Sequence, residues 1–172
     1  MRVVGKQTNS RMCYVCGLDN PEGLQAHFYN MEDGSVMTKF SYRDTQQSFP
    51  GRVHGGLVAT MLDELGLRAL WVKNSEDNFG VTMTMNVKLR KPVPYNKPLI
   101  GKGLVTKENS KFVIIKTEIF NMDGVLLAES ELTYLKLDTS KIVGDDIDPH
   151  EEMCYLIEDD VTEINFGRST NE

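Results

Sequence analysis

A single long helix is predicted from Gly55 to Val72, with its end near Asn74-Ser75. Its residues are apolar nearly all round, yet two carboxylates, Asp63 and Glu64, stand in its middle. A helix that is apolar on every side must be covered by other elements over most of its surface. The rest of the chain therefore has to supply a wrapping layer, and this requirement constrains the fold more than any other feature.

Segments that alternate apolar and polar residues flank this helix on both sides. Before it, residues 24–31 and 35–42 predict a hairpin around the turn dipeptide Asp33-Gly34. After it, residues 81–90 alternate strictly, as in a half-buried strand. Three further strands are predicted at residues 99–107, 111–121 and 125–137. Because no strand–helix–strand alternation is present, we predict an α+β fold in which a curved antiparallel sheet packs around the helix.

The composition is that of one globular domain. The chain has 172 residues, of which 40% are hydrophobic and 26% charged, enough to bury a sizeable core. No apolar run approaches the ~18 residues that a membrane span needs, and residues 1–11 lack the apolar stretch of a signal peptide. The odd number of cysteines, three, argues against a disulfide framework. We therefore expect a cytoplasmic protein with no membrane span.

Charge divides the chain into two unequal parts. Residues 139–172 carry ten acidic and two basic residues, whereas the remainder carries fifteen acidic and seventeen basic residues. We therefore expect three regions: a flexible N-terminal arm at 1–12, a domain at 13–138 and an acidic C-terminal extension at 139–172, with a short helix near 149–157. The mildly basic body suits an anionic ligand such as coenzyme A, but it lacks the basic stripe that nucleic-acid binding requires.

The loop that opens the helix carries the most distinctive residues. His54-Gly55-Gly56 leaves backbone N–H groups uncovered, and the positive end of the helix dipole points the same way. Such a site suits a polarised carbonyl or a developing oxyanion. No serine or cysteine stands at a nucleophile-elbow motif, so a triad is not predicted. A structural role for His54, as a helix cap, stays open beside a binding role.

The two acids differ in their helical neighbours. Glu64 has Arg68 at i+4, which predicts a surface ion pair, whereas Asp63 has no opposite charge at these spacings. Asp63 lies nine residues after His54, about 13 Å along the axis, too far to act on a carbonyl held by its own loop. Either the two are unrelated, or the acid of one chain acts with the loop of another across a two-fold axis. A solvated stripe is the plainer reading for both acids.

These residues carry a family resemblance. His54-Gly55-Gly56, followed by Ala59-Thr60 and Asp63-Glu64, resembles the PaaI-like (phenylacetate-type) acyl-CoA thioesterases of the hot-dog superfamily. The resemblance extends over about Cys13 to Leu137. Two further segments, Cys13–Gly17 with Asn20–Leu24, and Asn86–Pro94, are similar to supporting motifs of that group.

The resemblance implies a hot-dog fold and a homodimer, or a dimer of dimers, that shares its active sites. It implies that Asp63 is the catalytic acid, acting on an acyl-CoA or other acyl thioester, and that Gly55 and Gly56 hold the carbonyl with His54 beside them. Water activation and direct attack by Asp63 both remain open. No metal and no cofactor are expected beyond coenzyme A as part of the substrate.

The remaining candidates would contact substrate. Family members often place Asn or Gln six residues before the histidine, where this chain has Ser48, with Gln47 just before it. Glu64 and Thr60 are further candidates on the helix. Arg90 and Lys91 are candidates for the phosphates of coenzyme A, although ordinary exposed charge is the plainer reading.

Cys13 and Cys16 form a lone CxxC pair. A zinc site usually needs four ligands, so we interpret the pair as a reduced structural element. Two other functions remain open on the same fold: a non-catalytic acyl-CoA-binding protein, and a hydratase or dehydratase in which His54 would work on the substrate.

Overall fold

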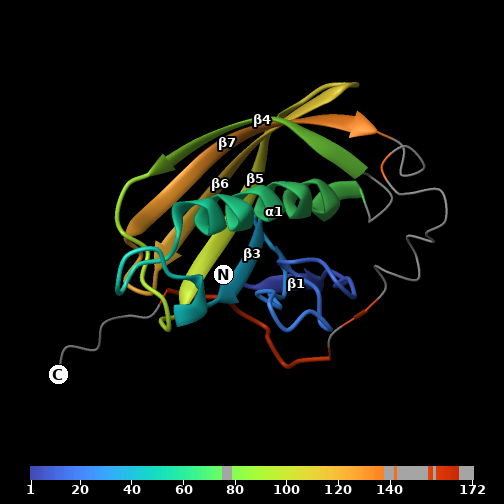
Figure 1. Ribbon diagram of the computed structural model, residues 1–172. Coiled ribbons are helices and arrows are strands. Elements are labelled where there is room, and N and C mark those ends of the chain that lie inside the picture. Colours follow the sequence, from blue (N-terminus) through green and yellow to red (C-terminus); the bar gives the residue numbers. More distant parts are fainter. Residues whose placement is uncertain (75–78, 138–141, 143–154, 157, 167–172) are drawn as a thin grey trace.

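One helix lies across the concave face of a curved sheet in the computed structural model (Figure 1). The structure describes residues 1–74, 79–137, 142, 155–156 and 158–166. The helix, α1, covers Gly55–Asn74 and is preceded by a short 3₁₀ turn, η1, at Asp44–Gln46. The strands are β1 Val3–Lys6, β2 Tyr29–Met31, β3 Val36–Phe40, β4 Phe79–Leu89, β5 Leu99–Glu108, β6 Phe112–Asn121 and β7 Leu126–Leu137.

All the described strand pairs are antiparallel. The order across the sheet is β1-β2-β3-β5-β6-β7-β4. Strand β4 follows α1 in the chain, but it pairs with the last strand, β7, rather than with β3 or β5. This arrangement confirms the predicted α+β fold and its curved sheet around a central helix. Among the described residues no helix combines the length and apolar composition of a membrane span.

The core lies between α1 and the sheet. Met61, Leu62 and Leu65 are fully buried on the helix. A Cβ at Gly103 of β5 would stand 2.4 Å from the Leu65 carbonyl oxygen, so only glycine permits this close approach. The sheet thus holds the middle turns of α1, where both carboxylates lie.

The N-terminal arm expected at residues 1–12 is wrong for residues 3–6, which form β1. This strand pairs with β2, and on its other side the Val3 N–H donates to the Thr162 carbonyl at 2.8 Å. Ile164 of the same C-terminal segment is buried against the sheet. A short strand of this kind is stabilised by pairing distant in sequence, which alternation within four residues does not reveal.

Other boundaries differ from the sequence-based expectation only in extent. The two hairpin strands are shorter than predicted, at three and five residues. The boundary at residue 138 and most of the expected helix at 149–157 lie outside the described residues.

Strand β4 forms an edge of the sheet. Its alternation is interrupted by a register shift between Thr82 and Thr84, so Met83 is 54% exposed, and Leu89 near the strand end is 55% exposed. A long edge strand with exposed apolar side chains can pair with another strand.

Candidate active site

The start of α1 is capped by the residue before it. The His54 carbonyl accepts the Leu57 N–H at 2.9 Å, and the His54 Nδ1 accepts the Gly56 N–H at 3.0 Å. His54 is therefore an N-cap through both its backbone and its side chain. Because Nδ1 accepts a hydrogen bond, the neutral ring carries its proton on Nε2.

The two glycines of the loop differ in what their N–H groups bind. The Gly56 N–H is bound by His54, whereas the Gly55 N–H has no acceptor among the described residues. Gly55 lies next to the end of β4, since a Cβ there would stand 2.9 Å from Leu89 Cδ1. Of the predicted pair of oxyanion donors, the Gly55 N–H is the one that is free in this state.

Asp63 faces the β4–β7 side of the helix and is partly buried. Its Oδ1 accepts from the Thr82 hydroxyl at 2.7 Å and from the Tyr134 hydroxyl at 3.2 Å. Thr82 and Tyr134 are register partners on β4 and β7, so both side chains project from one point of the sheet. Within the described part of the chain Asp63 Oδ2 has no hydrogen-bond partner.

Tyr134 ties the backbone of the helix to the sheet as well. Its hydroxyl also donates to the Asp63 carbonyl at 2.7 Å. Burial, and then the negative charge of Asp63, raise the pKa of Tyr134 above its ordinary value, so the hydroxyl stays protonated and remains a donor. Thr82 and Tyr134 were not predicted from the sequence, because each is one polar residue among many on an alternating strand.

Glu64 points away from Asp63, toward the N-terminal segment. Its Oε1 accepts from Arg68 Nε at 2.8 Å, but this pair is buried rather than on the surface as predicted. The Arg68 side chain is 1% exposed and packs between the Phe28 and Trp71 rings, about 4.7 and 4.6 Å from their centroids. Burial opposes its charge, yet Glu64 raises the pKa of Arg68 overall. Glu64 therefore holds a buried cation, which does not favour its predicted contact with substrate.

The loop residues that were predicted to contact substrate, Gln47 and Ser48, lie at the surface. Gln47 is exposed at the loop surface, where its Oε1 is 3.5 Å from the Tyr95 hydroxyl, and Ser48 is exposed in the adjacent turn. Gln46 is buried, and its side chain binds the Arg43 N–H and the Tyr14 hydroxyl. The residue that organises this loop is thus Gln46.

The other three predicted substrate contacts differ in whether their side chains already bind another residue; they are Thr60, Arg90 and Lys91. Thr60 donates its hydroxyl to the Gly56 carbonyl at 2.9 Å, within the first turns of α1. Arg90 is paired with Glu129 through both Nε, at 3.0 Å, and a terminal nitrogen. Lys91 is exposed, and no ion pair to it occurs among the described residues.

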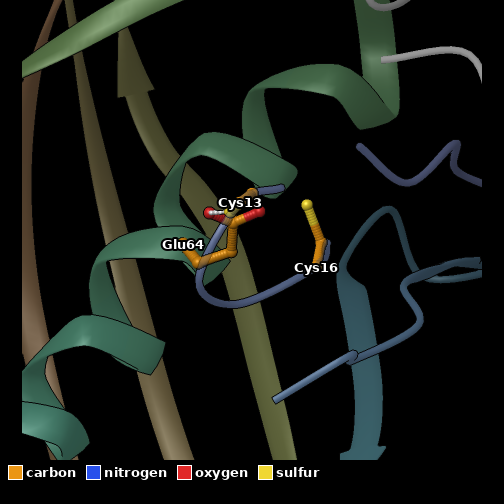
Figure 2. A group of neighbouring side chains, drawn as sticks. All are labelled: Cys13, Cys16 and Glu64. Atoms are coloured by element: carbon orange, nitrogen blue, oxygen red, sulfur yellow. Dashed lines mark hydrogen bonds between the residues drawn. The ribbon is translucent and has the colours of Figure 1, made fainter. Parts of the chain in front are cut away.

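The CxxC pair lies beside Glu64 of α1, whereas Thr82 and Tyr134 contact Asp63. Figure 2 shows the Glu64 carboxylate reaching from α1 toward the loop of Cys13 and Cys16. The Cys13 thiol and then Arg68 lower the pKa of Cys16 to about 7, against the effect of burial. The interaction with Cys16, with burial and Glu64, raises the pKa of Cys13. Glu64 as a neighbour of the thiols was not predicted, since the two segments are fifty residues apart.

Comparisons with known proteins relate this chain to thioesterases. Residues 50–128 match the model of the thioesterase superfamily. An acyl-coenzyme A thioesterase of Mus musculus is 27% identical over 125 residues, which are 70% of this chain and 52% of that protein. The chain thus spans about half the length of this curated relative.

Two solved structures show the same fold. A thioesterase superfamily protein has a TM-score of 0.65 at 25% identity, over 72% of this chain and 63% of that chain. A hypothetical thioesterase from Streptococcus pneumoniae, solved with coenzyme A, has a TM-score of 0.58 at 20% identity, over 66% of this chain and 89% of that chain. The match to residues 50–128 spans the capped loop, α1 and strands β4 to β6. The chain is therefore similar to the thioesterase superfamily over residues 50–128, and its sheet wrapped around a single helix is the arrangement of the hot-dog fold.

Proposed function

We propose that this chain is an acyl-CoA thioesterase, which hydrolyses a thioester to a free acid and coenzyme A in the cytoplasm. The observation that carries the proposal is the half-engaged carboxylate of Asp63 on the central helix of a domain similar to the thioesterase superfamily. The curated mouse relative acts on acyl-coenzyme A, and the pneumococcal structure was solved with coenzyme A. Both support coenzyme A as the leaving group.

Two neighbouring hydroxyl groups fix the orientation of the Asp63 carboxylate. Thr82 and Tyr134 fix Oδ1 with neutral donors, which leaves Oδ2 directed away from them. A carboxylate held in one orientation can take a proton from water or attack a carbonyl carbon. In the first route water adds to the thioester carbon as its proton passes to Asp63. The C–S bond then breaks, and the thiolate of coenzyme A leaves with that proton.

The second route forms a covalent intermediate on the same residue. Asp63 Oδ2 adds to the thioester carbon, the thiolate leaves, and water hydrolyses the resulting anhydride. Repeated turnover in ¹⁸O-labelled water identifies the second route when water attacks the Asp63 carbon of the anhydride, because ¹⁸O then enters the Asp63 side chain and is detected by peptide mass spectrometry. Attack of water on the acyl carbon puts the label in the product acid in either route.

The carbonyl oxygen needs donors that Asp63 cannot share within one chain. Gly55 and Asp63 are eight helical residues apart, about 12 Å along the axis. We infer that the Gly55 N–H of the opposite subunit stabilises the oxyanion that develops beside Asp63. The exposed edge of β4 supports this assembly, because a second strand can pair there and Leu89 at the end of β4 lies against Gly55. The working unit is therefore a homodimer, which can associate further into a dimer of dimers.

The state of His54 weighs against the hydratase alternative. A histidine base needs an unprotonated nitrogen directed at substrate, but Nδ1 is bound to the Gly56 N–H and Nε2 carries the proton. In a thioesterase, this Nε2–H is a second donor toward the carbonyl, beside the Gly55 N–H.

The coenzyme A phosphates would be met by Lys91 rather than by Arg90. Arg90 is held by Glu129, whereas Lys91 is exposed at the end of β4, near the start of α1. Lysine binds phosphate as a point charge, so its contribution falls as salt rises.

The test is release of free thiol from a panel of short, medium, long and aromatic acyl-CoAs, followed with a colorimetric thiol reagent. Wild-type protein is expected to turn over at least one of them, and Asp63→Asn is expected to be inactive while folded. Asp123→Asn, in the exposed turn after β6, is the matched control. Normal turnover by Asp63→Asn would contradict the assignment. Binding of acyl-CoA without turnover by the wild type would identify the non-catalytic alternative.

A further inference from the structure

We propose that Cys13, Cys16 and Glu64 form a binding site for a thiophilic divalent cation of the zinc class (Figure 2). The site lies on the side of α1 that faces the N-terminal segment of the chain, and no step of the proposed hydrolysis uses its ligands. The proposed cation site can therefore be tested independently of the thioesterase proposal.

The spacing of the three side chains is already close to that of a metal site. Their ligand atoms all lie within 4.8 Å of one another, and Cys13 Sγ is 3.8 Å from Glu64 Oε2. Tetrahedral zinc, with Zn–S of about 2.3 Å and Zn–O of about 2.0–2.2 Å, separates its ligand atoms by roughly 3.5–3.8 Å. A rotamer adjustment of the two thiols is sufficient to enclose a cation. The fourth position is left to water or an external ligand.

The loop that carries the cysteines is built to hold both sulfurs. The Val15 N–H donates to Cys13 Sγ at 3.3 Å, and the Gly17 N–H donates to the Cys13 carbonyl at 2.8 Å. A Cβ at Gly17 would stand 2.4 Å from that carbonyl oxygen, so this tight turn requires glycine. On the other side Ser10 Oγ lies 3.3 Å from Cys16 Sγ. Donors to sulfur of this kind stabilise the thiolates that bind metal.

Arg68 positions the third ligand. It binds Glu64 Oε1 at 2.8 Å and the Thr8 carbonyl at 2.6 Å, and Glu64 Oε2 is left facing Cys13. A second-layer hydrogen bond of this kind is what orients carboxylate ligands in metal sites. Arg68 therefore acts as a positioning residue.

Charge balance favours a divalent ion in this partly buried place. Arg68 is fully buried and keeps its charge. With both thiols protonated, Glu64 and Arg68 neutralise each other. With both thiols ionised, two thiolates and Glu64 carry three negative charges, which a divalent cation and Arg68 balance again. Exchange of two protons for one divalent ion thus leaves no uncompensated buried charge.

The experiment uses the full-length reduced protein, freed of metal by a chelator and titrated with Zn²⁺ in a calorimeter. We expect one equivalent to bind and the melting temperature to rise. Co²⁺ in place of Zn²⁺ is expected to give the intense near-ultraviolet absorption of thiolate-to-cobalt charge transfer. This signature reports sulfur ligation in the wild-type protein, so it does not depend on any variant folding.

Variants identify the ligands. Cys13→Ser with Cys16→Ser is expected to weaken Zn²⁺ affinity at least 100-fold, and Glu64→Gln about 10-fold or more. Cys154→Ser is the matched control, which removes the third thiol and is expected to bind Zn²⁺ as the wild type does. The proposal is overturned if the reduced wild type binds no Zn²⁺, if Co²⁺ gives no charge-transfer band, or if binding requires Cys154. Its failure would leave the thiol-release assay unchanged, so the two proposals are separable.

Discussion

Two adjacent carboxylates on one helix face opposite environments. Asp63 is held by two neutral hydroxyls, which engage one of its oxygens, whereas Glu64 is held by a fully buried guanidinium. A neutral donor fixes the orientation of a carboxylate without neutralising its charge, so the second oxygen stays available for a contact with water or substrate. A buried cation instead neutralises the acid and makes it part of the core. Asp63, with one oxygen free, is therefore the acid that we propose to be reactive, whereas Glu64 is paired within the core.

The largest expected effect is on kcat, when the charge of each of the two acids is removed in turn. Asp63→Asn keeps the shape and the hydroxyl contacts but removes the charge, so kcat is expected to fall by about 10³-fold or more. Glu64→Gln is expected to change kcat by less than about 10-fold, measured on folded protein. Equal losses in the two variants would remove the distinction.

The Glu64–Arg68 pair is expected to matter for the stability of the fold rather than for catalysis. Arg68→Met leaves the Glu64 carboxylate partly buried without its cation, so we expect a loss of about 3–5 kcal/mol in the free energy of unfolding. Arg2→Met breaks an exposed pair with Glu32 and is expected to cost about 1 kcal/mol or less. Urea denaturation with a chelator present measures both. Losses of the same size would mean that the Glu64–Arg68 pair behaves as a surface pair.

The free N–H at the start of the helix gives a third test. Gly55→Pro removes that N–H at the first helical position, where proline is tolerated, and kcat/KM is expected to fall by about 10²-fold. Gly55→Ala adds the same Cβ beside Leu89 but keeps the N–H, so it is the matched control. If alanine lowers kcat/KM as much as proline does, crowding of Leu89 is the cause rather than the lost donor.

A third carboxylate extends the comparison with a smaller effect. Asp159 is bound by Lys6 at 2.7 Å and by the Tyr29 hydroxyl at 2.6 Å. Burial opposes its ionisation, but Lys6 and then Tyr29 lower the pKa of Asp159 to about 2. Its contribution to stability is thus present above its unfolded pKa of about 3.9 and is lost as the pH falls toward 2.

Asp159→Asn should therefore cost about 2 kcal/mol near pH 6 and almost nothing near pH 2. Urea denaturation at the two pH values measures this difference. A cost that is independent of pH would show that the ion pair with Lys6 does not stabilise the fold.

The sequence predicted the parts of the fold that local pattern determines. The start of α1 at Gly55 follows from the glycines and the cap before it, and β4 to β7 follow from their alternation. Strand β1 was missed because its stabilising partners, β2 and residues 162–164, are distant in sequence.

The candidate site also combines residues that a local motif predicts with residues that only the fold brings together. Asp63 and His54-Gly55-Gly56 were predicted from one continuous motif, and their separation along the helix left either unrelated roles or a site shared between two chains. Thr82 and Tyr134 were not, because only the β4–β7 register brings them together beneath Asp63. The buried state of Arg68 was also missed, since i+4 spacing gives the pair but not the N-terminal residues that cover it.

The shared site is tested most directly by a mixed dimer. Asp63→Asn and Gly55→Pro chains with different tags are co-expressed, and the heterodimer is purified through both tags. If the acid of one chain acts with the loop of the other, one of the two sites carries both lesions and the other carries none. The shared site predicts about half of the wild-type activity from two nearly inactive parents. A heterodimer no more active than its parents, or a protein that stays monomeric, would contradict it.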